Sequence, residues 1–115
     1  MKVGVIGSRG FKDYDLVVKT LSKIDITLII SGGALGADTL GERYAKENNI
    51  ETKIFLPDWR THGKVAGFLR NTDIINESDT IVAFWDGTSR GTADSIGKAN
   101  KLSKPVIIVN YETNI

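Results

Sequence analysis

The sequence predicts an α/β protein, a three-layer sandwich in which helices cover both faces of a five-stranded parallel sheet. Three observations predict this class. Short apolar runs alternate with segments of helical periodicity, in the order βαβαβαβαβ. The connections are short, and every crossover between strands contains a helix. The apolar runs are continuous, as expected of parallel strands that are buried on both faces.

Glycine and proline residues mark several boundaries of the predicted strands. The first run ends at Gly7, the third is closed by Pro57, and the last begins after Lys104 and Pro105. The predicted strands are 3–7, 26–30, 51–57, 80–85 and 106–110.

Four helices are predicted from apolar residues at helical spacing, the first of them preceded by Asp13 as a candidate N-cap. The longest irregular stretch is 57–63, after the third strand. The helices are 14–24, with Leu16, Val17, Thr20, Leu21 and Ile24 on one face; 36–49, with Ala37, Leu40 and Tyr44 inward; 63–78, with Val65, Phe68, Leu69, Thr72 and Ile75 at helical spacing; and 91–103.

Composition limits the classes of function. The chain has 115 residues, so we expect a single domain over 1–115. It has no cysteine and one histidine, His62, which excludes thiolate chemistry and a histidine-based metal site. The net charge of +1 shows no bias toward nucleic acid. No apolar run has the roughly 20 residues of a membrane helix, so we expect a cytoplasmic protein without a membrane partner.

Glycine-rich loops follow three of the predicted strands. They are "GSRGF" (7–11), "SGGALGAD" (31–38) and "WDGTSRGTAD" (85–94). With a strand order of 3-2-1-4-5, a common one, the three loops meet in one crevice at the carboxyl ends of the strands.

Two of these loops run into helix starts, where free N–H groups favour phosphate and glycine allows a close approach. The alternative is that the same residues are only caps and tight turns. The predicted ligand-binding residues in the loops are Gly7, Ser8, Arg9, Ser31, Gly32, Gly33, Gly36, Asp38, Asp86, Gly87, Thr88, Ser89, Gly91 and Thr92.

Two standard phosphate-binding fingerprints are absent. The first loop has no GxGxxG, and "GGALG" has the wrong spacing for it. The segment "GTADSIGKA" has one residue too many for a P-loop and lacks Ser or Thr after Lys98. We therefore expect neither a standard dinucleotide site nor a P-loop enzyme.

Four blocks in order, "GSRGF", "SGGALGAD", "PDW…GKVAGFLRN" and "WDGTSRGTADSI", resemble the YspA-related branch of the SLOG superfamily. That superfamily also includes the LOG nucleosidases and the DNA-processing protein DprA. The resemblance implies a Rossmann-like fold of order 3-2-1-4-5 that binds nucleotides or nucleotide-derived ligands. It also implies a sensor or processor of such molecules, often in bacterial and phage conflict, and a homo-oligomer.

The resemblance to the LOG nucleosidases is weaker in catalytic residues. Their signature is similar to GGxGTxxE with a partner arginine. Here Gly91 and Thr92 are kept, Ser95 stands at the place of the glutamate, and Arg70 looks like the arginine. If the chain is an enzyme, we predict Asp86 and Arg70 as catalytic, because a carboxylate can stabilise an oxocarbenium-like state. A capping role is the alternative for Asp86, and also for Asp38 and Asp94.

The segment 57–71 supplies the remaining candidates. Trp59 follows a strand end in a polar segment, so its indole could stack on a base. Lys64, Arg70 and Asn71 could reach the same crevice, although solvated helix charge is the alternative for Lys64 and Arg70.

These observations favour a protein that binds a phosphorylated nucleoside or NAD-derived nucleotide signal above strands one, two and four, as a sensor or a sequestering protein. One alternative is a small nucleotide hydrolase, such as an N-glycosidase. A second is a nucleic-acid-binding module, which the absence of a basic stripe disfavours. No cofactor is certain, but a divalent metal could accompany the ligand phosphates.

Overall fold

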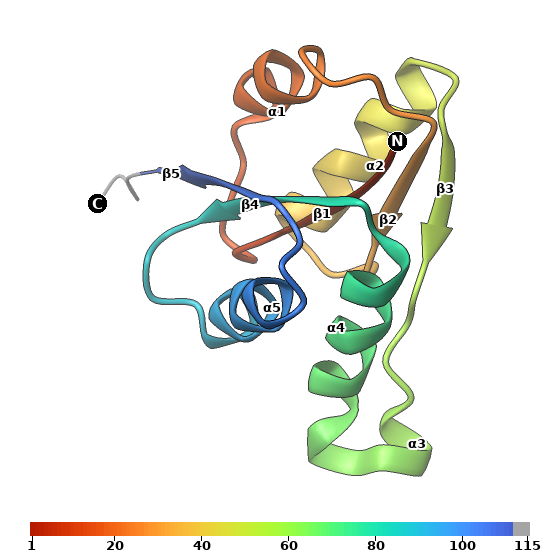
Figure 1. Cartoon of the computed structure of the whole chain (residues 1–115), viewed down its shortest axis with the longest axis vertical. Coiled ribbons are helices and arrows are strands. Elements are labelled where there is room, and N and C mark those ends of the chain that lie inside the picture. The colour runs from red at the N-terminus through yellow and green to blue at the C-terminus, as the bar shows by residue number, and fades with distance from the viewer. Residues whose placement is uncertain (112–115) are drawn as a thin grey trace.

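The computed structural model describes residues 1–111, whose strands form one parallel sheet in the order β3-β2-β1-β4-β5 (Figure 1). This confirms the predicted strand order. Strand β1 lies at the centre and pairs with both β2 and β4. The strands are β1 (Lys2–Gly7), β2 (Leu28–Ser31), β3 (Glu51–Ile54), β4 (Thr80–Trp85) and β5 (Val106–Asn110).

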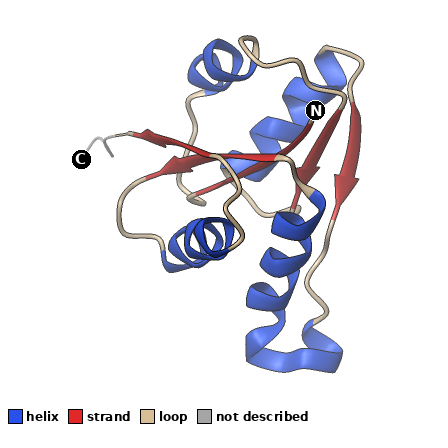
Figure 2. Ribbon diagram, in the orientation of Figure 1, coloured by secondary structure: helices blue, strands red, loops and turns tan. Residues whose placement is uncertain are grey.

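Helices cover both faces of the sheet, as Figure 2 shows. Helices α1 and α2 lie on one face, and α4 and α5 lie on the other. None of the helices within residues 1–111 is long and apolar enough to cross a membrane. The helices are α1 (Tyr14–Leu21), α2 (Ala37–Glu47), α3 (Trp59–His62), α4 (Ala66–Glu77) and α5 (Arg90–Lys101), with a 3₁₀ turn at Gly63–Val65.

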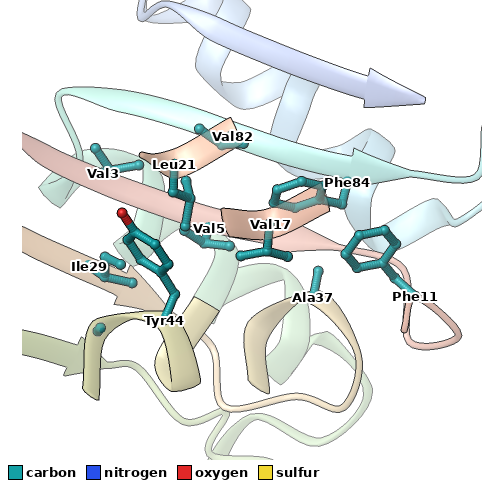
Figure 3. Packing of buried hydrophobic residues seen from close by; sticks show 11 residues of the cluster. Val3, Val5, Phe11, Val17, Leu21, Ile29, Ala37, Tyr44, Val82 and Phe84 are labelled. Carbon is teal, nitrogen blue, oxygen red and sulfur yellow. The ribbon is translucent and has the colours of Figure 1, made fainter. Parts of the chain in front are cut away.

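The core on the first face is built by α1, α2 and the loop after β1 (Figure 3). Val17 and Leu21 of α1 are fully buried against the sheet, as their predicted spacing required. The ring of Phe11, in the loop after β1, stacks on Phe84 of β4 with centroids 4.8 Å apart. This contact anchors the first glycine-rich loop to the carboxyl end of the sheet.

The core on the second face is aliphatic. Ile6, Ile30 and Ile81 project from the central strands toward α4 and α5. Ile74 and Ile75 of α4 are buried against them. The two helices are therefore held close enough to frame a crevice between them.

The two edge strands depart from the prediction of strands buried on both faces. Every residue of β3 is exposed, and β5 exposes Ile107 and Ile108 at 41% and 43%. The central strands β1 and β4 are buried as predicted. The pattern "ETKI" of β3 is polar because an edge strand is covered less completely by helices.

The prediction of a buried apolar face on the 63–78 helix is wrong for the first half of that helix. Val65, Phe68 and Leu69 are 53%, 46% and 43% exposed. The buried residues of this helix are Ala66, Asn71, Ile74 and Ile75. These apolar residues are exposed because the amino-terminal part of α4 extends, together with α3, past the end of the sheet (Figure 1). The short helix α3 also lies inside the stretch 57–63, which was predicted to be irregular.

Lys104 caps the carboxyl end of α4. Its Nζ donates to the carbonyl oxygens of Ile75, Asn76 and Ser78 at 2.6, 2.9 and 2.8 Å. We expect Lys104→Met to lower the free energy of unfolding by about 1–2 kcal/mol, because three carbonyls at a helix terminus lose their donor. Urea unfolding measures this loss, with the exposed Lys12→Met as control. Equal stability of both variants would show that the cap contributes nothing.

Candidate functional site

A cavity of about 450 Å³ opens at the carboxyl ends of the central strands, between the loops after β1, β2 and β4. Its walls come from segments far apart in the chain, so the strand order is what assembles it. The residues that line it are Ile6, Ser8, Arg9, Gly10, Ala34, Asp38, Arg70, Asn71, Ile74, Asp86, Ser89, Gly91, Thr92 and Ser95.

The loop after β1 is tied to the loop after β4. The Ser8 backbone N–H donates to the Phe84 carbonyl oxygen at 3.0 Å. The Ser8 hydroxyl accepts from the Asp86 backbone N–H at 3.2 Å. Two of the three glycine-rich loops are therefore held in register at one wall of the cavity.

The loop 31–38, "SGGALGAD", binds the carboxylate of its own residue Asp38. One carboxylate oxygen of Asp38 accepts from the backbone N–H of Gly32 at 2.8 Å and of Ala34 at 3.4 Å. Gly36 has φ +84°, and a Cβ there would overlap the Ser8 carbonyl oxygen. The N–H groups of Gly32 and Ala34 are already hydrogen-bonded to Asp38, and Gly36 is needed for the close packing of the loop. A ligand phosphate would therefore have to bind elsewhere in the cavity.

Asp38 is only 6% exposed although it lines the cavity. Burial raises the pKa of its carboxyl from 3.8 to about 6, against the opposing effects of the two backbone hydrogen bonds and of Arg70. A group with such a pKa exchanges protons near neutrality, which is the property of a general acid or base.

The raised pKa of Asp38 makes a prediction about stability. Because the folded chain binds this proton more tightly than the unfolded chain, the contribution is stabilising at low pH and is lost as pH rises through about 6. We expect the Asp38 contribution to the free energy of unfolding to be about 1 kcal/mol smaller at pH 7 than at pH 5. Urea unfolding of the wild type and Asp38→Asn at both values isolates this component, since Asn keeps an acceptor but does not titrate. An identical pH dependence in the two proteins would contradict the assignment.

Arg70 of α4 crosses the crevice to the loop after β2. Its Nη1 donates to the Gly32 carbonyl oxygen at 2.6 Å, and its Nε donates to Asn71 Oδ1 at 3.0 Å. A Cβ at Gly32 would overlap the guanidinium, so glycine is required for this contact. Burial lowers the pKa of Arg70, Asp38 opposes this, and the nearby positive charge of Arg9 adds to it. Arg9 and Arg70 thus line one cavity together with the carboxylates of Asp38 and Asp86.

Asn71 joins α4 to α5 at the back of the crevice. Its Nδ2 donates to the Gly91 carbonyl oxygen at 3.3 Å and to Asp94 Oδ2 at 3.4 Å. Asp94 is in turn ion-paired with Lys98 at 2.8 Å. Asn71 therefore has a positioning role between the helices in addition to lining the cavity.

Asp86 shapes the start of α5. Its Oδ1 accepts from the backbone N–H of Thr88 at 2.9 Å and of Ser89 at 2.8 Å. These hydrogen bonds lower its pKa, so the carboxylate stays ionised. Asp86 therefore has the role of a turn residue before α5, whose N-cap is Ser89, and it also lines the cavity.

The first turn of α5 offers hydrogen-bond donors to the cavity. The hydroxyls of Ser89 and Thr92 lie 3.2 Å apart, and both residues line the cavity with Gly91. Backbone N–H groups in a first helical turn have no partner within the helix. Ser95, one turn further on, is buried at the cavity wall.

A second cavity, of about 290 Å³, adjoins the first on the side of β3. Trp59, which begins α3, lines it and is 54% exposed. Asp58 positions this tryptophan, because its carboxylate accepts from the Thr61 backbone N–H at 3.1 Å and caps α3.

The structure brings most of the predicted residues to these two cavities, but not all. Ser31 is buried and donates to Glu42 Oε2 at 2.7 Å. Gly7 packs against Phe84 and Ala37, and Gly36 lines a neighbouring hollow. Predicted residues outside both cavities are Gly7, Ser31, Gly36, Lys64, Gly87 and Thr88; those inside are Ser8, Arg9, Gly32, Gly33, Asp38, Trp59, Arg70, Asn71, Asp86, Ser89, Gly91 and Thr92.

Sequence reasoning missed mainly apolar wall residues. Ile6 and Ile74 line the first cavity, and Leu35, Leu56 and Pro57 line the second. Leu35 and Leu56 are 74% and 72% exposed, which is unusual for leucine. Their position directly after strand ends was the available signal. Within residues 1–111, no group of three or more His, Asp or Glu residues is placed to hold a metal ion.

The fold and the crevice define a class: a Rossmann-like α/β protein with a polar cavity at the carboxyl ends of its strands. Comparison with known proteins narrows this class. A model of the YspA, cpYpsA-related SLOG family matches residues 1–62, and the chain belongs to that family.

Two relatives extend over most of the chain. The gene 61 protein of Mycobacterium phage D29 is 34% identical over 117 residues, covering 92% of this chain and 94% of the phage protein. The X-ray structure of TM1055, a structural genomics target, aligns with a TM-score of 0.72 and 26% identity, covering 91% of this chain and 71% of that one.

Proposed function

We propose that this protein binds a phosphorylated nucleoside or an NAD-derived nucleotide in the crevice and acts as a sensor or sequestering protein. Membership of the SLOG family supports a nucleotide-related function. A role in conflict between phage and bacterium is part of this proposal, and the observation that prompts it is that a similar protein is encoded by a phage.

The observation that carries this proposal is the pair of arginines at the cavity. Arg9 and Arg70 both line it. Burial and then the positive charge of Arg9 disfavour the charged form of Arg70, and Asp38 opposes them. A phosphate between them favours the charged form and accepts planar, charge-assisted hydrogen bonds. The first turn of α5, with Ser89 and Thr92, supplies hydrogen-bonding groups for the remainder of the ligand.

Mass spectrometry after incubation with a mixed nucleotide pool tests the proposal. The pool contains nucleoside monophosphates, NAD, ADP-ribose and cyclic nucleotides, and both the released ligand and the flow-through are analysed. We expect one intact compound to be released from heat-denatured protein while the pool stays unchanged. Absence of any bound compound, with nothing consumed, would contradict the proposal.

A second candidate function is a nucleotide hydrolase that cleaves an N-glycosidic bond. Asp38 favours it, because a buried carboxyl with a pKa of about 6 beside an arginine has the protonation behaviour of a general acid or base. Asp86, which stays ionised, would stabilise the oxocarbenium-like state. Release of free base with loss of turnover in both Asp38→Asn and Asp86→Asn would support this candidate over the binder.

A divalent cation that enters with the ligand phosphates is part of the proposal. Asp38 and Asp86 are the carboxylates at the cavity that could meet such an ion. Titrations in the presence of magnesium and in EDTA decide the point, because a bridging cation would make affinity depend on the metal.

We also propose that the protein self-associates through the exposed part of α4. Phe68 and Leu69 of α4, and Val65 of the 3₁₀ turn before it, are exposed apolar residues. Light scattering of the wild type and Phe68→Asp tests this, and a monomer in both would refute it.

A further inference from the structure

The two cavities meet at a charged junction. Arg9, Ala34 and Arg70 line both of them. The guanidinium of Arg70 is held there from two sides, by the Gly32 carbonyl oxygen and by Asn71. Within residues 1–111, Arg70 Nη2 makes no hydrogen bond that would compete with a ligand.

The second cavity differs from the first in chemistry. The first presents the hydroxyls of Ser8, Ser89 and Thr92. The second is bordered by the exposed side chains of Leu35, Leu56 and Trp59, which come from two separate segments, the loop after β2 and the stretch after β3. An exposed apolar group assembled from separate segments is typical of a surface that takes a ligand.

Each region suits one part of a molecule. An indole with flanking leucines suits the flat face of a nucleobase. Two like charges, of which one is half-buried, suit a phosphoryl group with more than one negative oxygen. A wall of hydroxyls and carboxylates suits the hydroxyl groups of a sugar.

We propose that the ligand spans both cavities as a nucleoside diphosphate joined to a second sugar. The base stacks on Trp59, the phosphoryl linkage lies between Arg9 and Arg70, and the second sugar lies against Ser8, Ser89 and Thr92. This rests on the proposed function, which it deepens by naming the ligand class. A mononucleotide would occupy only one of the two cavities together with the junction.

Calorimetric titration of the full chain tests the proposal with matched probes. They are ADP-ribose and UDP-glucose, which have two ends, AMP and UMP, which lack the second sugar, and ribose 5-phosphate, which lacks the base. We expect at least one two-ended probe to bind about tenfold or more tightly than both its mononucleotide and ribose 5-phosphate.

Two variants separate the cavities. Trp59→Ala should weaken the two-ended probe and its mononucleotide about tenfold and leave ribose 5-phosphate unchanged. Thr92→Val should weaken the two-ended probe and ribose 5-phosphate and leave the mononucleotide unchanged. Leu102→Ala is the control for Trp59→Ala, because Leu102 is a similarly exposed apolar residue that borders neither cavity.

The outcomes distinguish this inference from the proposed function. Equal affinities for the mononucleotide and the two-ended probe would overturn the inference while leaving nucleotide binding established. Loss of binding in Leu102→Ala equal to that in Trp59→Ala would also overturn it. Failure of every probe to bind the wild type would overturn both proposals.

Discussion

Arg70→Ala is expected to weaken ligand binding about 100-fold, which corresponds to roughly 3 kcal/mol. Arg70 lines both cavities and is the arginine that is half-buried, so its hydrogen bonds to a phosphate form with little competition from water. Calorimetric titration with the compound identified from the nucleotide pool measures the loss.

Two variants control this prediction. Arg70→Lys keeps the charge but removes the planar group of donors, so we expect an intermediate loss of affinity. Arg60→Ala removes an exposed arginine of α3 that lines neither cavity, and its affinity should equal that of the wild type. Thermal unfolding shows whether Arg70→Ala is still folded. A folded Arg70→Ala with wild-type affinity would contradict the assignment of the phosphate to this residue.

Gly36→Ala is expected to lower the free energy of unfolding by about 3 kcal/mol or more. Gly36 has φ +84° and ψ −126°, a conformation that L-residues rarely adopt. The added methyl group would also overlap the carbonyl oxygens of Ser8 and Arg9, which are backbone atoms. The loops after β1 and β2 would have to separate, so the expected loss of stability is larger than backbone strain alone would cause. Urea denaturation measures the loss.

Gly97→Ala is the matched control for Gly36→Ala. Gly97 lies inside α5, and a Cβ there would meet no atom within 4 Å. Replacing glycine by alanine in a helix interior should raise the free energy of unfolding by about 0.5–1 kcal/mol. Opposite signs for the two substitutions would confirm the structural roles, and equal small effects would refute the requirement for glycine at position 36.

The order of elements was predictable because each central strand and its following helix carry a local signal. The runs at 3–7 and 80–85 are apolar throughout, and β1 and β4 are buried to match. The spacing of Val17 and Leu21 determined the buried face of α1 in the same local way. The first half of α4 failed this reasoning, because Phe68 and Leu69 have core-like spacing but lie beyond the end of the sheet.

The location of the candidate site was predictable from the sequence, but the hydrogen bonds and the apolar walls within it were not. Ser8, Arg70 and Thr92 lie in separate segments, and the predicted strand order was enough to bring them to one cavity. Spacing alone gave no sign that the Gly32 and Ala34 N–H groups bind Asp38, since this hydrogen bonding depends on the path of the folded loop. The apolar wall at Leu35 and Leu56 was missed for the same reason.

By itself the sequence determined the fold class, because periodicity and turn residues act over a few positions. The strand order 3-2-1-4-5 was expected as a common order and as what the family resemblance implies, and the sheet has that order. Tertiary structure alone decided which groups remain available to a ligand. The glycines of "SGGALGAD" are used to position Asp38 and to make room for Arg70. Hydrogen bonds are satisfied between whichever groups the fold brings together, so their partners are set by three-dimensional proximity rather than by neighbours in the chain.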